Sequence, residues 1–525
     1  MNIAVLYTGG TIGSAGNPLG PLSNSAFSGA FKSLITPILQ QQFPGINVSF
    51  PPITFPESPK SGTLDSTNLQ PSDWCIMAQA IVSSYSQYDG WVILHGTDSM
   101  DFTGPALSFL LSSFNTYGFS SAVLSKPVVI TGSQVPLFYQ ASSSESLTVK
   151  FNTDAFQNVC GAIAAAQSGV PEVCVYFDSY LFRGNRVVKT NASQFNAFSS
   201  PNYPPLGQYG IELAINFSEV LPLPATADIS LELAPVRERL AQQLSYVADH
   251  IDKIQVMQFN AFPAPYAVGG KSVIADLITA CVGTGIKGLV LESYGEGNFP
   301  SGDPDKPESG AIFQALKTAN EAGVVIVDCT QVLSGIVNDS AYASGAWLPK
   351  VGALNPADMT PMAALAKLIV LSTVSQYFNW PSDVVKNLMQ TNLMGEMLSV
   401  NRLDSRSNPY LSAGQSLSAL DGSATLINDP VQGPLLQASG SSTPLWKPLG
   451  SPAPGNMPGR LVMQYDGNLA FYDQSNVLLW SSSITLSGPS ASALVLRGSY
   501  SDKTLSLYIY NYAMGKVTKT LYQQT

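Results

Sequence analysis

The side chains most able to do chemistry follow short apolar runs near the amino terminus. The run Ile3–Leu6 leads into "TGGTIG", which holds Thr8 and Thr11 among three glycines. Its spacing lacks the lysine of a P-loop and does not match the dinucleotide-binding pattern, so it is not predicted to hold phosphate. A threonine on a tight turn can act as a nucleophile when a neighbour removes its proton. The residues leave two interpretations open, a nucleophilic Thr11 or a turn with a structural role only.

A second polar group, "HGTDSM", follows another apolar run. Asp98, next to Thr97, could hold a substrate ammonium or pair with a lysine; the alternative is a cap for the helix that follows. His95 by itself is more typical of a packed core histidine than of a base. Because His250 is the only other histidine, the sequence offers few histidine ligands for a zinc site and few candidates for the base of a Ser-His-Asp triad.

Two further segments carry polar side chains of suitable size. Asp65, Ser66 and Thr67 could hold the charged ends of an amino acid, or could cap the helix that Pro71 opens. Lys189 is a solvated lysine unless it faces the "HGTDSM" group. In that position burial would favour the neutral amine and let it accept a proton, whereas a neighbouring carboxylate would oppose that change.

The elements that must position these side chains read as an α/β fold. Residues 1–195 alternate apolar runs with segments of helical length, which predicts a parallel sheet with helices on both faces. Ligands bind at the carboxyl ends of the strands in such sheets, and the polar tips 8–11, 95–99 and 131–134 are expected there. Helices are predicted near 71–86, 102–114, 270–282, 310–322, 361–373 and 381–389.

The pattern changes after Tyr410, where helical periodicity gives way to short strands and polar turns. A weak repeat around Trp446, Trp480 and Tyr522 predicts an all-β domain of three similar units. The predicted organisation is an α/β domain, a second α/β domain, a linker and a β domain, at residues 1–205, 206–400, 401–409 and 410–525.

Composition limits the partners. Charged residues make up 11% and the net charge is −10, which argues against nucleic-acid binding. Five scattered cysteines are expected to be buried free thiols. No apolar run approaches membrane-spanning length and Met1 has no basic leader, so we expect no membrane segment and a cytoplasmic location by default, with non-classical export left open. No metal or cofactor is expected.

Seven motifs occur in a single order along residues 1–400, and together they closely resemble the bacterial L-asparaginases of the cytoplasmic type. They are TGGTIG (8–13), DST (65–67), HGTDSM (95–100), TGSQVP (131–136), RGNRVVKTNASQFNAFSSPN (183–202), SYGEGN (293–298) and TQVLSGIVN (330–338). The resemblance implies two α/β domains, the first flavodoxin-like, and hydrolysis of L-asparagine. It also implies homo-oligomers, usually tetramers built from dimers, with active sites at the dimer interface.

Position by position, the resemblance implies that Thr11 forms the acyl-enzyme and that Thr97, Asp98 and Lys189 form the second catalytic set. It assigns residues 65–67 to the α-groups of the substrate and Asn298 to a place near the neighbouring subunit's site.

Three departures from that family affect the expected activity. Leu19 stands where a mobile loop usually carries a tyrosine, whose hydroxyl Tyr7 or a later residue would have to replace. The usual RSDG is replaced by the longer segment 137–156. Val188 and Val332 stand where the family has a threonine and a cysteine of a proposed effector site, so we expect no allosteric activation by asparagine.

The stretch "MQYDGNLAFYD" places polar side chains in one alternating register, so that on a strand they share a face and suit sugar hydroxyls. It resembles the bulb-lectin motif QxDxNxVxY, with Ala470 in place of valine, which implies a β-prism and one mannose-type site. The residues of that site are Gln464, Asp466, Asn468 and Tyr472. The alternative is a structural or oligomerisation domain with a relic site. The rival for the whole chain is a carbohydrate-binding or assembly protein whose asparaginase part has decayed.

Overall fold

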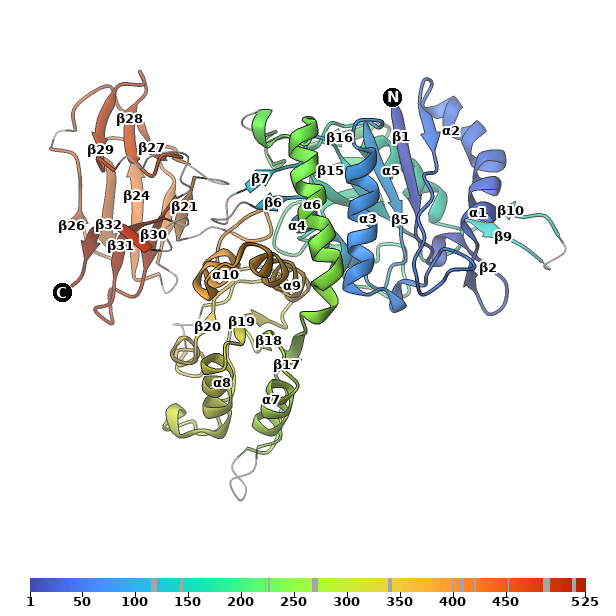
Figure 1. The fold of residues 1–525 in the computed structure, drawn as a ribbon. Coiled ribbons are helices and arrows are strands. Elements are labelled where there is room, and N and C mark those ends of the chain that lie inside the picture. The colour runs from blue at the N-terminus through green and yellow to red at the C-terminus, as the bar shows by residue number, and fades with distance from the viewer. Residues whose placement is uncertain are drawn as a thin grey trace.

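The chain forms two α/β domains followed by a β domain at the far end from the amino terminus (Figure 1). The computed structural model describes all residues except 115–119, 142–144, 222, 225–226, 267–271, 339–341, 399–400, 406–409, 420–421, 452, 485–491 and 512–515.

An eight-stranded sheet forms the centre of the first domain, in the order β16-β15-β12-β11-β8-β5-β1-β4. The five strands from β11 to β4 are parallel, as the alternation of apolar runs and helices predicts. Their bounds are β1 Asn2–Tyr7, β4 Asn47–Ser49, β5 Gly90–Leu94, β8 Val128–Thr131 and β11 Val173–Phe177. The antiparallel edge consists of β12 Tyr180–Arg183, β15 Gly207–Tyr209 and β16 Leu213–Ile215.

Helices cover both faces of this sheet, as predicted. On β1, Ile3 and Val5 join a core cluster with the helices on one face, while Ala4 and Leu6 join a cluster on the other, because side chains alternate along a strand. The first face carries α1 Asn24–Ala30, α2 Thr36–Gln42 and α5 Ala155–Ala166, and the second carries α3 Pro71–Ser84, α4 Met100–Leu110 and α6 Ala234–His250. The helix predicted to end at residue 114 ends earlier, because Ser113–Phe114 form the short strand β6.

The second domain is a smaller parallel sheet, β17 Val256–Asn260, β18 Gly288–Ser293, β19 Val325–Thr330 and β20 Ala353–Leu354. Its helices are α7 Val273–Gly283, α8 Ala311–Glu321, α9 Pro361–Phe378 and α10 Ser382–Met389. Helix α9 packs against α4 and α6 of the first domain and so joins the two domains (Figure 1).

Helix α9 also corrects an expectation, because it continues beyond the predicted end at residue 373. Among the described residues it is the one helix long and apolar enough to cross a membrane by length and composition. Its apolar side chains instead belong to the core shared by both α/β domains, and its Lys367 is fully buried in an ion pair with Glu396.

The last part is built from three four-stranded antiparallel sheets, as the threefold repeat predicts. Trp446, Trp480 and Tyr522 lie on β26 Pro444–Trp446, β29 Leu478–Ser481 and β32 Lys516–Gln523, the final strand of each sheet. The remaining strands are β21 Arg402–Asp404, β22 Tyr410–Leu411, β23 Ser416–Ser418, β24 Ala424–Asp429, β25 Gly433–Ala438, β27 Gly459–Met463, β28 Leu469–Asp473, β30 Ser492–Arg497 and β31 Ser506–Asn511.

The predicted linker 401–409 is partly wrong. Strand β21 lies inside it and pairs with β30, so this stretch already belongs to the β domain, while residues 406–409 lie outside the described residues. A single buried apolar side chain, Leu403, anchors the strand, and one such residue in a polar run gives no periodic signal.

Candidate active site

The turn after β1 is held against two other segments by its glycines. A Cβ on Gly9 would lie 2.1 Å from the carbonyl oxygen of Leu64, and a Cβ on Gly10 would lie 2.3 Å from the Cα of Gly96. Both glycines have positive φ, 119° and 75°, which L side chains rarely adopt. Since Thr11 and Thr97 each follow one glycine of the Gly10–Gly96 contact, the backbone brings the two threonines into one region.

The neighbours of Thr11 have structural roles. Thr8 is buried, and its hydroxyl donates to the Leu94 carbonyl at 3.0 Å. The Tyr7 hydroxyl donates to the Gly13 carbonyl at 2.9 Å, its ring stacks on Phe27, and burial raises its pKa. Tyr7 therefore supports the turn from the core and does not replace the missing loop tyrosine.

The loop itself is a small hairpin. Strands β2 Ser14–Ala15 and β3 Gly20–Pro21 pair antiparallel, and Leu19 precedes β3 with 56% of its surface exposed. The exposed leucine side chain has no hydroxyl group. The site therefore lacks any hydrogen bond that a tyrosine would make from this position.

The segment 65–67 lies against the same region. Ser66 is buried, its Oγ has no hydrogen-bond partner, and a Cβ on Gly96 would lie 2.3 Å from that Oγ. Ser99 Oγ donates to the Ser66 carbonyl at 2.8 Å. The exposed Asp65 accepts from the amide and the hydroxyl of Thr67, at 3.1 and 3.0 Å, and so caps its own short turn. The alternative that this segment caps the helix opened by Pro71 is therefore wrong for Asp65, because the N-cap of that helix is Gln70. Ser66 remains unsatisfied beside the site.

Lys189 reaches the "HGTDSM" tip across 92 residues of sequence, and its Nζ donates to Thr97 Oγ1 at 2.9 Å. The same ammonium pairs with Asp98 Oδ1 at 2.6 Å, and the side chains of Lys189 and Asp98 are 19% and 55% exposed. The capping alternative for Asp98 is wrong, because the N-cap position of α4 is Ser99 and has no side-chain cap.

His95 is a packed core histidine, as predicted. Its ring is fully buried, with Nδ1 at 2.6 Å from the Gly96 carbonyl and Nε2 at 3.1 Å from the Thr103 hydroxyl. A carbonyl only accepts, so Nδ1 carries the proton and Nε2 accepts from Thr103. Burial lowers the pKa of His95 to about 4, and both ring nitrogens are occupied.

Asn298 lies elsewhere, in the turn after β18 of the second domain. Its backbone N–H donates to the Tyr294 carbonyl at 2.8 Å, and its side-chain oxygen accepts from the Ser344 hydroxyl at 2.9 Å. Within the described part of the chain, no hydrogen bond connects Asn298 to the Thr11 region of the same chain.

Comparison with known proteins agrees with this geometry. Residues 2–220 match the family model "Asparaginase, N-terminal" and residues 271–378 match "Glutaminase/Asparaginase C-terminal domain". The L-asparaginase 1 of Escherichia coli K12 is 31% identical over 398 residues, which cover 75% of this chain and 98% of that protein. The chain belongs to the asparaginase family. Its members are amidohydrolases, and this chain is an enzyme of that class.

Other relatives widen the comparison. The crystal structure of L-asparaginase I from Vibrio cholerae superposes with a TM-score of 0.55 at 30% identity, covering 76% of this chain and 99% of that chain. The mouse 60 kDa lysophospholipase is 34% identical over 334 residues, 63% of this chain and 49% of that protein. Neither family-model match extends beyond residue 378.

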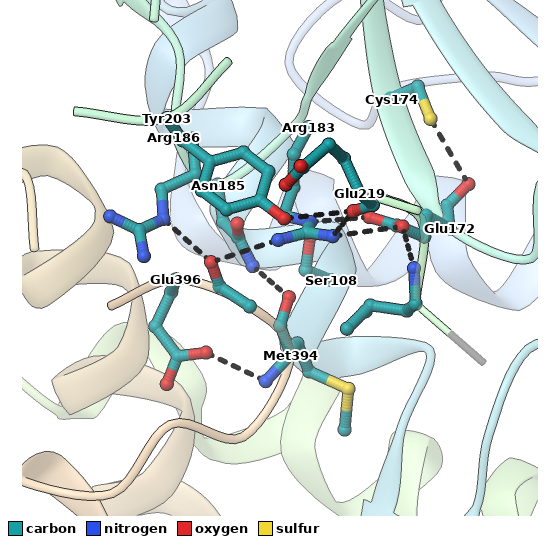
Figure 2. A network of polar contacts seen from close by, with 12 residues as sticks. Ser108, Glu172, Cys174, Arg183, Asn185, Arg186, Tyr203, Glu219, Met394 and Glu396 are labelled. Atoms are coloured by element: carbon teal, nitrogen blue, oxygen red, sulfur yellow. Dashed lines mark hydrogen bonds and ion pairs between the residues drawn. The ribbon is translucent and has the colours of Figure 1, made fainter. Parts of the chain in front are cut away.

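In this asparaginase the "RGNR" part of the lysine motif is a structural clamp (Figure 2). Arg183 forms a buried ion pair with Glu172 at 2.6 Å, and Asn185 donates to the Met394 carbonyl at 2.8 Å. Arg186 pairs with Asp358 at 2.6 Å and donates to the carbonyl of residue 395 at 2.6 Å. The network ties the second domain to the strand that carries Lys189.

Three further polar residues lie behind the asparaginase site, and the sequence placed only one of them, Gln134, through the predicted tip 131–134. Gln134 lies 3.4 Å from Thr97, and Asp101 accepts the backbone N–H of Lys189 at 3.0 Å. Asp154 accepts the backbone N–H of Gln134 at 2.9 Å, so the segment that replaces RSDG still ends in a carboxylate behind the "TGSQVP" turn. Gln134 stands at a predicted strand tip and Asp101 three residues after Asp98, which are the only sequence signals.

Val188 and Val332 come together in the folded chain. Both line a small cavity of about 60 Å³ between the two α/β domains, together with Thr330, Asp358 and Thr360. Within the described part of the chain, no group of three or more His, Cys, Asp or Glu side chains is arranged to hold a metal ion.

The polar residues of the β domain gather on the β27–β28 hairpin. Asn468 Nδ2 donates to Gln464 Oε1 at 3.0 Å, and Gln464 Nε2 donates to the Tyr472 hydroxyl at 2.9 Å. Asp466 accepts the backbone N–H of Asn468 at 3.0 Å, and Ser482 Oγ donates to Asn468 Oδ1 at 2.9 Å. The four motif residues therefore form a hydrogen-bonded cluster without a ligand.

Proposed function

We propose that the enzyme hydrolyses L-asparagine to L-aspartate and ammonia through an ester on Thr11. The observation that carries this proposal is the Thr97–Asp98–Lys189 set, hydrogen-bonded together beside the glycine contact that leads to Thr11. The relatives named L-asparaginase support the choice of substrate.

The charged ends of the amino acid have matching groups at the site. Asp98 is 55% exposed while one of its oxygens holds Lys189, so its carboxylate can also accept the substrate ammonium. The unsatisfied Ser66 hydroxyl can donate to the substrate carboxylate, and satisfying a buried polar group is favourable. Asp65 and Thr67, both exposed on the same turn, complete the proposed binding loop.

The chemical steps follow from this placement. Thr11 Oγ1 attacks the side-chain amide carbon, and the hydroxyl proton passes by way of Thr97 and Lys189 to the departing nitrogen, which leaves as ammonia. Water then cleaves the ester and restores the Thr11 hydroxyl. Backbone N–H groups at the strand tips stabilise the oxyanion.

We also propose that the enzyme works as a homo-oligomer, a dimer or tetramer. Asn298 belongs to the substrate set by family resemblance, yet its contacts in one chain lie within the second domain. A second copy would bring it to the site. Light scattering on the purified protein reports the assembly, and Asn298→Ala is expected to raise KM without dissociating it.

Ammonia release from asparagine tests the central proposal. The parent protein should release ammonia, Thr11→Ala should not, and Thr148→Ala on the exposed strand β10 Thr148–Val149 should match the parent. Rapid-quench mass spectrometry of the parent should show an aspartyl ester on the peptide that holds Thr11. A folded parent that releases no ammonia would defeat the enzyme and favour the decayed-asparaginase rival.

A second function is favoured by the β-domain cluster. We propose that the three sheets form a β-prism and that Gln464, Asp466, Asn468 and Tyr472 bind a mannose-type sugar. Ala470 lacks the methyl groups of valine, so apolar contact with the sugar is reduced and affinity is expected to be low. Asn468→Ala should abolish mannose binding on a glycan array. Absence of binding by the parent would favour the alternative, a structural or oligomerisation domain with a relic site.

A further inference from the structure

Gln134 occupies the gap between Thr97 and the loop that follows Lys189. Its Oε1 lies 3.4 Å from Thr97 Oγ1, and its Nε2 donates to the Gln194 carbonyl at 3.2 Å. It stands just after β8, at the same sheet edge as the tips of β1 and β5. Gln134 therefore contacts one member of the proposed catalytic set without belonging to it.

The orientation of the Gln134 amide follows from its partners. A carbonyl oxygen only accepts, so the side that meets Gln194 must be the NH2 group, and the oxygen must face Thr97. The Lys189 ammonium only donates and already takes one lone pair of Thr97 Oγ1. The Thr97 proton accordingly points to Gln134, and the second lone pair of Thr97 stays open.

The backbone under Gln134 is fixed from behind. The Asp154 carboxylate accepts the N–H groups of Gln134 and Val135 at 2.9 and 3.0 Å. Asn158 Nδ2 donates to the Gly132 carbonyl at 3.0 Å and also contacts Asp154 Oδ2 at 3.3 Å. Asp154 and Asn158 are 7% and 1% exposed, so this support is part of the core.

We infer that Gln134 is a positioning residue for asparagine hydrolysis. It sets the rotation of the Thr97 hydroxyl so that the open lone pair of Thr97 accepts a hydrogen bond from the Thr11 hydroxyl. The 3.4 Å separation is long for a hydroxyl hydrogen bond, and such contacts shorten when substrate closes the site. This inference rests on the proposed function, because it assigns Gln134 a role only if Thr11 is acylated.

Two substitutions separate positioning from packing. Gln134→Met keeps the length of the side chain but removes the acceptor, so kcat should fall about tenfold, which corresponds to ~1.4 kcal/mol of activation free energy. KM should stay within about twofold, since a hydrogen bond used in the transition state affects kcat. Gln134→Glu keeps an acceptor for Thr97 in either protonation state, but only the protonated carboxyl can also donate to the Gln194 carbonyl. This variant should therefore retain more activity than Gln134→Met and lose part of it as the new carboxyl ionises.

The measurements are ammonia release over a pH series and thermal unfolding of each variant. Gln167→Met is the matched control, because Gln167 lies at the opposite end of α5 from Asp154 and its side-chain amide donates to the Ile163 carbonyl within the same helix. A fall in the activity of Gln134→Glu as its carboxyl ionises, absent from the parent and with unchanged melting, would support positioning.

Three outcomes would overturn the inference. They are parental kcat in Gln134→Met, a loss confined to KM, or equal losses in both variants that follow a lowered melting temperature. If Gln134→Met does not fold, the pH profile of Gln134→Glu decides alone. An inactive parent would remove the proposed function and this inference together, whereas an active parent with an active Gln134→Met removes only the inference.

Discussion

Lys189 and Arg186 lie three residues apart, yet their substitution by methionine should have opposite effects. Lys189 makes its ion pair with an Asp98 carboxylate that is 55% exposed, and such a pair contributes about 0–1 kcal/mol to folding because water screens it. Arg186 and Asp358 are 2% and 3% exposed, and removing one partner of a buried pair costs about 3–5 kcal/mol. Lys189→Met should therefore melt close to the parent, and Arg186→Met well below it.

Activity should show the reverse order among the folded proteins. Proton transfer by a positioned side chain contributes about 10²–10⁴-fold to a rate, so Lys189→Met should lower kcat by about a thousandfold. Lys189→Arg keeps a cation for Asp98 but holds its proton throughout the accessible pH range, so it should be nearly as inactive. Arg186→Met, assayed well below its melting temperature, should retain a much larger part of the parental kcat.

Coupled ammonia assays and thermal unfolding of the four proteins test this reasoning. Active Lys189→Arg would show that a charged lysine is sufficient and that no proton leaves it. A large drop in the melting temperature of Lys189→Met would show that the Asp98 pair is structural, contrary to its exposure.

Three further predictions follow from other parts of the chain. Asparagine saturation should be hyperbolic, because Val188 and Val332 offer no hydrogen-bonding side chain to a second asparagine in the cavity between the domains; sigmoidal curves would contradict this. Leu19→Tyr should raise kcat by up to about tenfold if the hydroxyl gains one transition-state hydrogen bond, and Leu19→Phe should not. Burial, with Glu57 and Asp252 nearby, raises the pKa of Asp73 from 3.8 to about 6. The folded state then binds this proton more tightly than the unfolded state, so the Asp73 contribution to stability falls as pH rises from about 4 to about 6. The melting temperature of Asp73→Asn relative to that of the parent should therefore be higher at about pH 7.5 than at about pH 5. Equal differences at both pH values would refute this prediction.

The α/β architecture and the edge of the sheet that holds the site follow from the order of residues along the chain. Continuous apolar runs indicate strands buried on both faces, and parallel strands bring their carboxyl ends to one edge. The tips after β1, β5 and β8 were therefore predictable, and so was the location of Thr11 and Thr97 among them. The threefold repeat was visible because its aromatic residues recur on the last strand of each sheet.

The partner of each polar side chain depends instead on how distant segments pack together. Asp98 could cap α4 or pair with a lysine, and the choice depends on where a strand 91 residues later arrives. Asp65 caps its own turn, Tyr7 supports Gly13, and Gln134 faces Thr97, although none of these contacts leaves a periodic pattern. Local sequence sets backbone period and turns, whereas a hydrogen bond needs two atoms within about 3 Å, and that distance is set by the packing of the whole domain.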